Sequence, residues 1–518
     1  MMSNRSADPL YQLIKSLTKA EKRHFKLYIK RSSSKEDLKI IQLFDALDQQ
    51  KAFDDKALQK KLAPLSKPQI SNLKAHLYKQ LLASLRLLKT VESTDLQLSE
   101  QLDYARLLYH KGLKNQSLRI LDKAKELAKQ NSKYNFLAQV ISLEKKIETL
   151  HITRSGINRV ENLMADSIEI SEHINRVARL SNLTLQLYGW YVQNGHARNQ
   201  EDEAAVHAFF SEQLPKDAHA ITDFYERMYL YQSYCWYAFI KQDFLQYYRY
   251  AQKWIDLFED QPLMKQVEPG HYIKGVHSLL NAHFDLRNHA AFEVALAQLE
   301  AFTQTPACLL NDNFRIHTLI YLYAARLNQH LMQGTFEKGL LLADELDQKL
   351  EEFSIYIDRH RLLVFHYKMA LLHFGSGQFE KSIDYVMRII NGPVDLRNDL
   401  HCYARILQLL AHYELGNLEL IEPLTKSAYR FMSKMETLTQ IEEAMFKFLR
   451  HSFKVNKRDL RPELEAFLSS IKHLEKNRFQ TRALAYLDII SWVESKLQKK
   501  SMSQVIFEKY IQSKHRYQ

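Results

Sequence analysis

Hydrophobic and polar positions recur with the period of an α-helix over most of the chain. In RLLVFHYKMALLHF (361–374), one apolar stripe comprises Leu362, Phe365, Met369 and Leu372. A second stripe follows after Gly375 and Gly377, and comprises Phe379, Ile383, Val386 and Ile390. Each stripe is typical of one buried helix face. We therefore predict two helices joined by a tight turn at Gly377.

The turn phrase occurs twice, as GTFEK at Gly334–Lys338 and as GQFEK at Gly377–Lys381. Other turn-like points lie at similar intervals, and the full set is Gly112, Gly156, Gly195, Asp243, Asn288, Gly334, Gly377 and Gly416. Neighbouring members of this set are roughly 40–50 residues apart, and a period in this range is typical of a stacked helical array. The sequence therefore predicts that one kind of helical hairpin is repeated along the chain.

Small residues flank several of these turns at repeated offsets. Ala370 precedes Gly377 by seven residues and Ser382 follows it by five; the same offsets relate Ala105, Gly112 and Ser117. Gly334 and Gly339 share part of the pattern, with Leu327 at the first small position. This spacing resembles the tetratricopeptide repeat (TPR). The resemblance implies that the first small residue packs on the second helix, the glycine opens the turn, and the later small residue closes the pair.

The expected fold is therefore all-α: a solenoid of stacked antiparallel helical hairpins, as in a TPR-like superhelix. The resemblance extends loosely over residues 95–450, although the period is longer than the repeat of about 34 residues in that family. An irregular helical domain whose hairpins share a turn by chance is the alternative. We expect a basic helical module at 1–92, the repeat array at 93–450 and capping helices at 451–518.

Composition favours helix throughout. The 518 residues include only 12 Gly and 10 Pro, which hairpins, β-turns and phosphate loops all require. No apolar run approaches the roughly 20 residues that span a membrane. The N-terminus shows no apolar stretch typical of a signal peptide. Cys235, Cys308 and Cys402 form no CxxC pair, so we expect a reducing cytoplasm and no membrane association.

An aromatic run extends from Phe224 to Trp254. One stripe comprises Phe224, Met228, Tyr231 and Cys235, and a neighbouring one comprises Tyr225, Tyr229, Trp236 and Ile240. Stacked hairpins contact a neighbour on each side, so such helices are apolar on two faces. Core packing is the interpretation we favour, and an aromatic groove for a peptide or base is the alternative.

Positive charge is concentrated at the N-terminal end. Residues 1–90 hold 19 Lys and Arg against 8 Asp and Glu, a balance of +11 in a chain of +12. Three capping boxes predict helix starts there, at Thr18–Glu21, Ser33–Glu36 and Ser66–Gln69. We predict a helix at 56–63, a turn at 64–66 and a long helix at 67–89.

This order is reminiscent of a helix-turn-helix, whose second helix reads the major groove. The long helix would bury Ile70, Leu73, Leu77, Leu81 and Leu85. Candidate nucleic-acid contacts are Lys60, Lys61, Lys67, Gln69, Ser71, Asn72, Lys74 and Lys79. The turn lacks the usual glycine, and a capping domain with a solvated basic face would show the same pattern.

No catalytic, cofactor or metal motif stands out. The sequence has no GxGxxG, Walker loop, HExxH or GxSxG. Histidines recur every six residues at His271, His277, His283 and His289. Because six residues rotate a helix by about 600°, neighbouring members cannot share a metal. We expect a non-enzymatic scaffold or adaptor that binds a protein or peptide on a concave surface. The alternative is a nucleic-acid-binding regulator that uses residues 1–90; the oligomeric state is left open.

Overall fold

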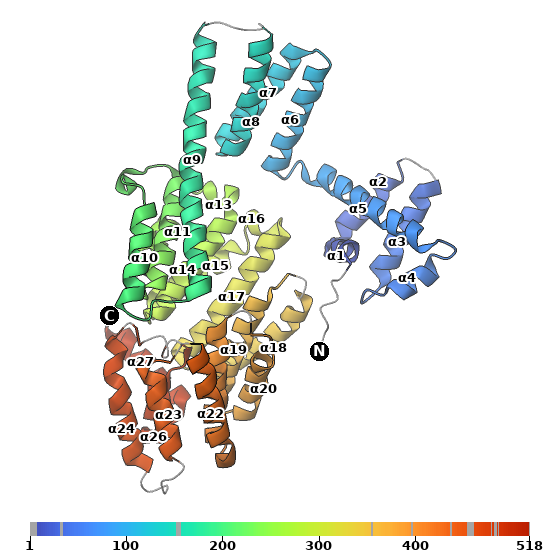
Figure 1. Ribbon diagram of the computed structural model, residues 1–518. Coiled ribbons are helices and arrows are strands. Elements are labelled where there is room, and N and C mark those ends of the chain that lie inside the picture. Colours follow the sequence, from blue (N-terminus) through green and yellow to red (C-terminus); the bar gives the residue numbers. More distant parts are fainter. Residues whose placement is uncertain are drawn as a thin grey trace. The chain divides into compact units, whose positions relative to one another are not determined.

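The protein is all-α in the computed structural model, as the sequence predicts (Figure 1). The structure describes residues 8–31, 35–151, 157–353, 356–394, 397–435, 438–452, 460–477, 479–480, 484 and 486–516. Within these ranges there are α-helices and short 3-10 turns but no strand. The predicted turn at Gly156 and the box at Ser33–Glu36 lie outside the described residues.

The chain divides into two compact units, residues 1–175 and 176–518, with the division inside helix α9. The helices of unit 1 are α1 (Pro9–Ser16), α2 (Lys19–Ile29), α3 (Lys35–Gln49), α4 (Asp55–Lys61), α5 (Lys67–Lys89), α6 (Thr94–His110), α7 (Lys114–Gln130), α8 (Tyr134–Leu150) and the start of α9 (Ile157–Asn194). Helices α1–α5 share one apolar core, whose described members lie between Leu10 and Leu85. Helices α6–α9 form another, between Leu98 and Ile174.

Unit 2 continues as consecutive helices packed side by side (Figure 1). Its first half comprises α10 (Gln200–Gln213), η1 (Ala218–Ala220), α11 (Phe224–Ile240), α12 (Phe244–Asp260), α13 (Met264–Val267), α14 (Pro269–Asp285), α15 (His289–Phe302), α16 (Pro306–Leu309), α17 (Asp312–Gln333) and α18 (Phe336–Glu352). Its second half comprises α19 (Arg359–Gly375), α20 (Phe379–Ile390), α21 (Asn398–Glu414), α22 (Leu418–Lys434), α23 (Gln440–Ser452), α24 (Leu460–Lys472), η2 (His473–Lys476), α26 (Ile489–Gln498) and α27 (Met502–Arg516).

One turn geometry joins the helices of many hairpins. One of the first two residues after the first helix is left-handed, with φ between 52° and 80°, and these residues are Gly112, Ser132, Gln242, Arg287, Gly334, Gly377 and Gly416. The next backbone N–H then donates to a carbonyl five residues earlier; Gln378 N, for example, lies 2.8 Å from His373 O. This is the Schellman pattern, which satisfies carbonyls at a helix end. Three of the seven turns use a residue other than glycine.

Two glycines allow hairpins to pack closely on their neighbours. A Cβ added to Gly339 would lie 2.8 Å from Leu372 Cδ2, so α18 approaches α19 at this point. A Cβ on Gly375 would overlap the ring of Phe336. Because real Cβ contacts are essentially never this short, the aromatic residue of the first FEK phrase requires a glycine in the following hairpin.

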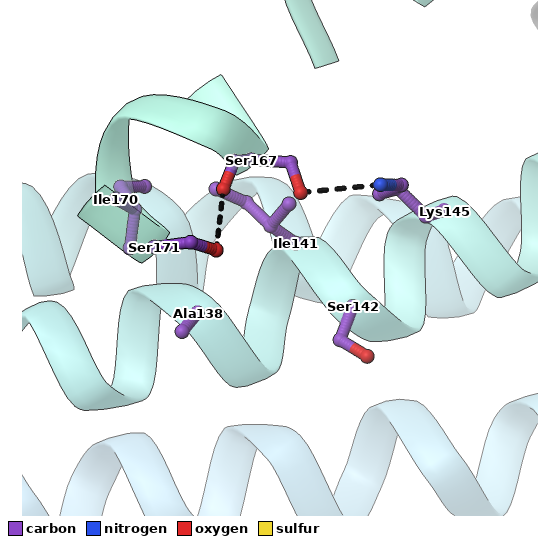
Figure 2. A pocket seen from close by; sticks show the side chains of 7 residues that line it. All are labelled: Ala138, Ile141, Ser142, Lys145, Ser167, Ile170 and Ser171. Carbon is purple, nitrogen blue, oxygen red and sulfur yellow. Dashed lines mark hydrogen bonds between the residues drawn. The ribbon is translucent and has the colours of Figure 1, made fainter. Parts of the chain in front are cut away.

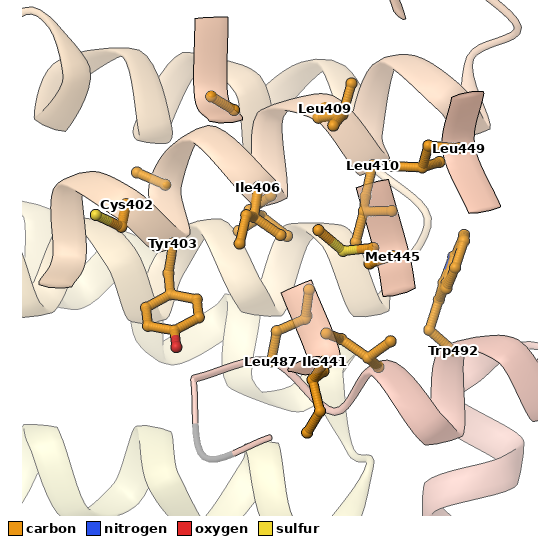
Figure 3. Close-up of a cluster of buried hydrophobic side chains, with 14 of the residues drawn as sticks. Cys402, Tyr403, Ile406, Leu409, Leu410, Ile441, Met445, Leu449, Leu487 and Trp492 are labelled. Carbon is orange, nitrogen blue, oxygen red and sulfur yellow. The ribbon is translucent and has the colours of Figure 1, made fainter. Parts of the chain in front are cut away.

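The C-terminal helices pack along the turn ends of earlier hairpins as well as on the last one. Trp492 of α26 donates to Glu414 Oε1 at 2.6 Å, and Figure 3 shows its ring beside the core that α21 and α23 build. Ser503 of α27 donates to the carbonyl of Gly334 at 2.6 Å, and Tyr510 lies 4.7 Å from the ring of His289. These contacts tie together hairpin turns that are remote from one another in the sequence.

Within the described part of the chain, no helix combines the length and the apolarity that crossing a membrane would require.

Candidate functional site: a half-buried cationic face in unit 2

Helix α14 presents a single half-exposed stripe. None of its residues is fully exposed, because the helices around it cover the remaining sides. The side chains of the stripe recur every three or four positions, as His271, Lys274, His277, Asn281 and Phe284. That spacing marks one face of a helix. The stripe is mostly polar, so core packing does not explain its composition.

The neighbouring helices α17 and α19 continue this face. Helix α14 packs on α17, and α17 packs on α19. Half-exposed residues on α17 include His317, Tyr321 and Ala324, and those on α19 include Arg361, Val364 and Lys368. The three stripes converge through direct contacts.

Tyr321 lies at the centre of this convergence. The ring of His277 stacks on it with centroids 3.9 Å apart and an interplanar angle of 7°. The Lys274 ammonium lies 5.9 Å from the Tyr321 ring, and the Arg361 guanidinium lies 5.6 Å from it. Arg361 also donates to Tyr321 Oη at 3.4 Å. We call the set Lys274, His277, Tyr321, Arg361 and Lys368 the cationic face.

Lys368 extends the cationic face along α19. Its ammonium donates to Asn328 Oδ1 on α17 and lies 5.7 Å from the ring of Phe284 on α14. Burial and the charge of Arg397 lower the pKa of Lys368 to about 8, although Asp285 acts in the opposite direction. Amide and aromatic contacts leave an ammonium largely uncompensated compared with a carboxylate partner.

The pKa shifts of His277 and Tyr321 are those expected beside positive charges. Burial, together with the charges of Lys274, Lys368 and Arg361, holds the pKa of His277 well below its ordinary value. Burial alone would raise the pKa of Tyr321, yet Lys274 and Arg361 outweigh it and the pKa is lowered. Both shifts favour the less positive form of the side chain.

The acidic groups nearby compensate only part of this charge. Asp358 caps α19 and lies 3.2 Å from Arg361, but its side chain is half exposed. Burial raises the pKa of Asp285 to about 7, against the charges of Arg287 and Lys368, which disfavours the charged form of this carboxyl group. Lys274 has no ion pair with any residue in the described ranges.

A further cation, Arg397, is paired with a carboxylate. Arg397 forms three hydrogen bonds of 2.7–3.1 Å with Asp399, which also accepts from Tyr486 Oη. Tyr486 in turn stacks on Tyr403 with centroids 4.2 Å apart. The C-terminal segment therefore covers the Arg397–Asp399 pair, and we exclude this pair from the cationic face.

A cluster of charges in unit 1 has a different character. Glu144 on α8 accepts from Arg159 on α9, and Lys125 on α7 lies 2.6 Å from Asp166 on α9. Burial raises the pKa of Glu144, while Lys125 and Arg159 oppose the shift. Because cations and carboxylates from α7, α8 and α9 are paired here, the network ties three helices together.

The structure places the predicted repeat-packing residues at two hairpins in equivalent positions. Ser382 Oγ donates to Ala370 O at 2.8 Å, and Ser117 Oγ donates to Ala105 O at 2.7 Å. All four residues are buried. Gly112, Gly334 and Gly377 are left-handed at their turns, and Gly339 lies at the close approach of α18 to α19. These residues shape the hairpins.

The predicted nucleic-acid contacts do not form one uniform set. Lys60 and Lys61 are exposed on α4, and Lys61 donates to Gln49 Oε1 at 2.6 Å. On α5 the exposed residues are Lys67, Gln69, Ser71, Asn72 and Lys79. Gln69 also accepts from Ser66 N at 2.9 Å, in the predicted capping box. Helix α5 packs on α1, α2 and α3, while α4 packs on α3.

Lys74 requires a correction, because it is not an exposed phosphate contact. Its ammonium lies 2.9 Å from Asp8 and 3.2 Å from Asp55, and 4.9 Å from the ring of Phe53. Only 17% of the side chain is accessible. The acids come from segments 66 and 19 residues away, so no local pattern could reveal the pairing.

The aromatic run of α11 is divided between core and surface. Phe224, Met228 and Cys235 are buried, and Tyr225, Tyr229 and Trp236 are half exposed. Of the regularly spaced histidines, His271, His277 and His283 lie on α14 and contact different neighbours, whereas His289 lies on α15. His271 contacts Gln232, His283 lies near Tyr248, and His289 lies near Tyr510.

A shallow depression between α8 and α9 in unit 1 holds about 270 Å³. Figure 2 shows its lining residues, Ala138, Ile141, Ser142, Lys145, Ser167, Ile170 and Ser171. Lys145 donates to Ser167 Oγ at 3.1 Å, and Ser171 Oγ donates to the Ser167 carbonyl at 2.7 Å. Ligand pockets hold roughly 300–1,000 Å³. This depression is slightly smaller than that range.

Sequence reasoning overlooked the cationic face. His277 was considered only as a metal ligand, and Lys274, Tyr321, Arg361 and Lys368 were not singled out. The available signal was weak: polar residues recur at three- and four-residue spacing on helices that are otherwise apolar, as in Lys274, His277 and Asn281.

Comparison with known proteins provides no family assignment: no protein-family model matches the chain, and no curated protein matches it either.

Proposed function

We propose that this chain is a non-enzymatic helical-repeat scaffold that binds a protein or peptide partner along the cationic face of unit 2. The observation that carries the proposal is the half-exposed polar stripe that continues over α14, α17 and α19. Repeat arrays present such continuous surfaces to extended partners. The tyrosine and arginine at the centre are residue types that dominate binding energy at interfaces.

The surface suits binding better than catalysis. Tyr321 and His277 are held by stacking, and Arg361 contacts His317, Tyr321 and Asp358. The pKa of His277 lies well below its ordinary value, because of burial and the surrounding cations, so it is a poor base at neutral pH. The arrangement therefore offers preformed donors and an aromatic surface.

Site-specific photocrosslinking in the native cell tests this proposal. A photoreactive side chain at Ala324, which is half exposed between Tyr321 and Asn328, should yield a discrete crosslinked partner. The matched control is Leu341 on α18, whose side chain is 76% exposed. Equal crosslinking at both positions would contradict a dedicated binding face.

The nucleic-acid hypothesis for residues 1–90 has a separate test. Each phosphate contact contributes a slope of about −0.9 in log affinity against log salt for duplex DNA. If α5 contacts phosphates, Lys67→Ala should flatten the slope by about one contact, whereas Lys74→Ala should not, because Lys74 is paired with Asp8. No binding of duplex DNA or single-stranded RNA at about 50 mM salt would eliminate the hypothesis.

A further inference from the structure

We propose that Lys274, Tyr321, Arg361 and Lys368 bind the side-chain carboxylates of an acidic, extended peptide segment. The inference rests on the proposed function, since it names the chemistry of the partner at that face. Three cationic groups lie on a half-buried surface, and among the described residues only Arg361 forms an ion pair with a carboxylate, that of Asp358.

The three cations of this face have few carboxylate partners among the described residues. Lys274 is held beside the Tyr321 ring without an acidic partner in the described chain. Lys368 donates to the neutral amide of Asn328, and Arg361 shares its charge with the half-exposed Asp358. Placing cations on a half-buried surface costs solvation, which an incoming anion would offset.

Lys274 and Arg361 converge on Tyr321. Arg361 and Lys274 both lie within 6 Å of the Tyr321 ring, and the Tyr321 hydroxyl contacts the Arg361 guanidinium. The charges of Lys274, Arg361 and Lys368 all act on His277. A carboxylate near the Tyr321 hydroxyl could therefore accept from a guanidinium or hydroxyl and gain from two ammonium groups.

The distance between the cations limits the length of peptide that can contact all of them. The cations lie on two of the three helices, with Lys274 on α14 and both Arg361 and Lys368 on α19. The Lys274 ammonium and the Arg361 guanidinium lie 5.9 and 5.6 Å from the centre of the Tyr321 ring, so they are at most about 12 Å apart, which about four extended residues would span at about 3.3 Å each. Side chains on one side of an extended segment recur at every second residue, so alternate acids could meet successive cations.

The same geometry disfavours nucleic acid. Single strands bind through aromatic rings on which bases stack. At this face, however, one side of Tyr321 is already covered by His277 at 3.9 Å. Half-buried cations are also less accessible to a wide duplex backbone than the exposed lysines of α4 and α5 are.

The test uses the full chain and fluorescence anisotropy with a labelled ten-residue peptide that alternates Glu with small residues and has an amidated C-terminus. A matched peptide carries Gln in place of Glu. We expect the Glu peptide to bind and the Gln peptide to bind at least about tenfold more weakly, equivalent to roughly 1.4 kcal/mol. Binding should weaken as salt rises, because exposed ion pairs are screened.

Two variants assign the binding to this face. Lys274→Met and Arg361→Met should each weaken the Glu peptide at least about tenfold. The matched control is Lys338→Met, on the exposed surface of α18, which should leave affinity unchanged. Tryptophan fluorescence verifies folding, because all four tryptophans lie in residues 190–492 of unit 2.

The remaining outcomes separate this inference from the proposed function. If Glu and Gln peptides bind equally and Ala324 still crosslinks to a partner, the carboxylate inference is wrong and the scaffold proposal survives. Binding that requires a free C-terminal carboxylate, or that is unaffected by both variants, also overturns the inference. Displacement of the peptide by oligouridine would indicate nucleic acid instead. If no peptide binds and Ala324 does not crosslink, both proposals fail.

Discussion

The basic N-terminal helices and the cationic face of unit 2 differ in how far carboxylates compensate their positive charges. Residues 1–90 carry a balance of +11, and the rest of the chain carries only +1. Yet many N-terminal cations are already paired, as in Lys22–Asp48, Lys26–Asp45 and Lys74–Asp8. In the nearly neutral part of the chain, by contrast, Lys274 has no carboxylate partner in the described ranges.

The two regions differ in whether a carboxylate lies close to each cation in the folded chain. A lysine that faces an aspartate contributes to folding, whereas a half-buried lysine that faces a tyrosine keeps its capacity to bind an anion. The lysines of α4 and α5 and the cations of unit 2 also differ in their exposure to solvent. Lys60, Lys67 and Lys79 are solvated, so water already satisfies them, while the cations of unit 2 are partly withdrawn from water.

The largest expected effect comes from removing a paired cation. Lys74→Ala leaves Asp8 and Asp55 without their partner, and we expect a loss of about 1–2 kcal/mol in the stability of α1–α5. The matched control is Lys67→Ala, an exposed residue on the same helix, which should change stability by less than about 0.5 kcal/mol.

Hydrogen exchange measured by mass spectrometry resolves this difference locally. Faster exchange of peptides from α1, which Asp8 caps, and from α4, which begins at Asp55, should appear in Lys74→Ala alone. Indistinguishable exchange in the two variants would mean that Lys74 stabilises the fold no more than a solvated lysine does. The claim that paired N-terminal cations contribute to folding would then be wrong.

A smaller effect, of opposite sign, is expected for an unpaired cation. Lys274→Met keeps the apolar stem beside Tyr321 and removes the ammonium, so the stability of unit 2 should stay unchanged or rise by up to about 1 kcal/mol. The urea midpoint from tryptophan fluorescence measures it. A midpoint well below that of the native chain would show that Lys274 has a structural role instead.

The smallest effect at neutral pH is expected for His277→Phe, which retains a ring against Tyr321. Burial and the surrounding cations lower the pKa of His277 in the folded protein. As pH falls below about 6.5, the unfolded chain gains a proton that the folded chain does not, so native stability decreases. His277→Phe removes this contribution and should lose less stability on acidification.

Urea midpoints at pH 7.5 and 5.5 provide the measurement. The groups that face His277 are Lys274, Asn281, Tyr321, Arg361 and Lys368, and all remain in the variant. A difference between variant and native protein that is the same at both pH values would contradict the positive potential assigned to this face.

Helices and many turns could be predicted from the sequence because their determinants are local. The long helix predicted at 67–89 is α5 with those same bounds, since a capping box and an apolar stripe of period 3.6 specify it within 23 residues. Gly112, Gly334, Gly377 and Gly416 were recognised because glycine tolerates a left-handed φ. At Gln242 and Arg287 the same turn exists without glycine, and only the following Asp243 and Asn288 indicated its place.

Only the tertiary structure decided which charges are compensated. Lys74 meets Asp8 across 66 residues, and Arg361 meets Tyr321 across 40. The cationic face needs residues from three helices that pack side by side, so its members are unremarkable in their own segments. Helix formation depends on neighbours three and four residues apart, which a sequence displays directly. Charge compensation depends on distances of a few ångströms between remote segments, and packing alone sets those distances.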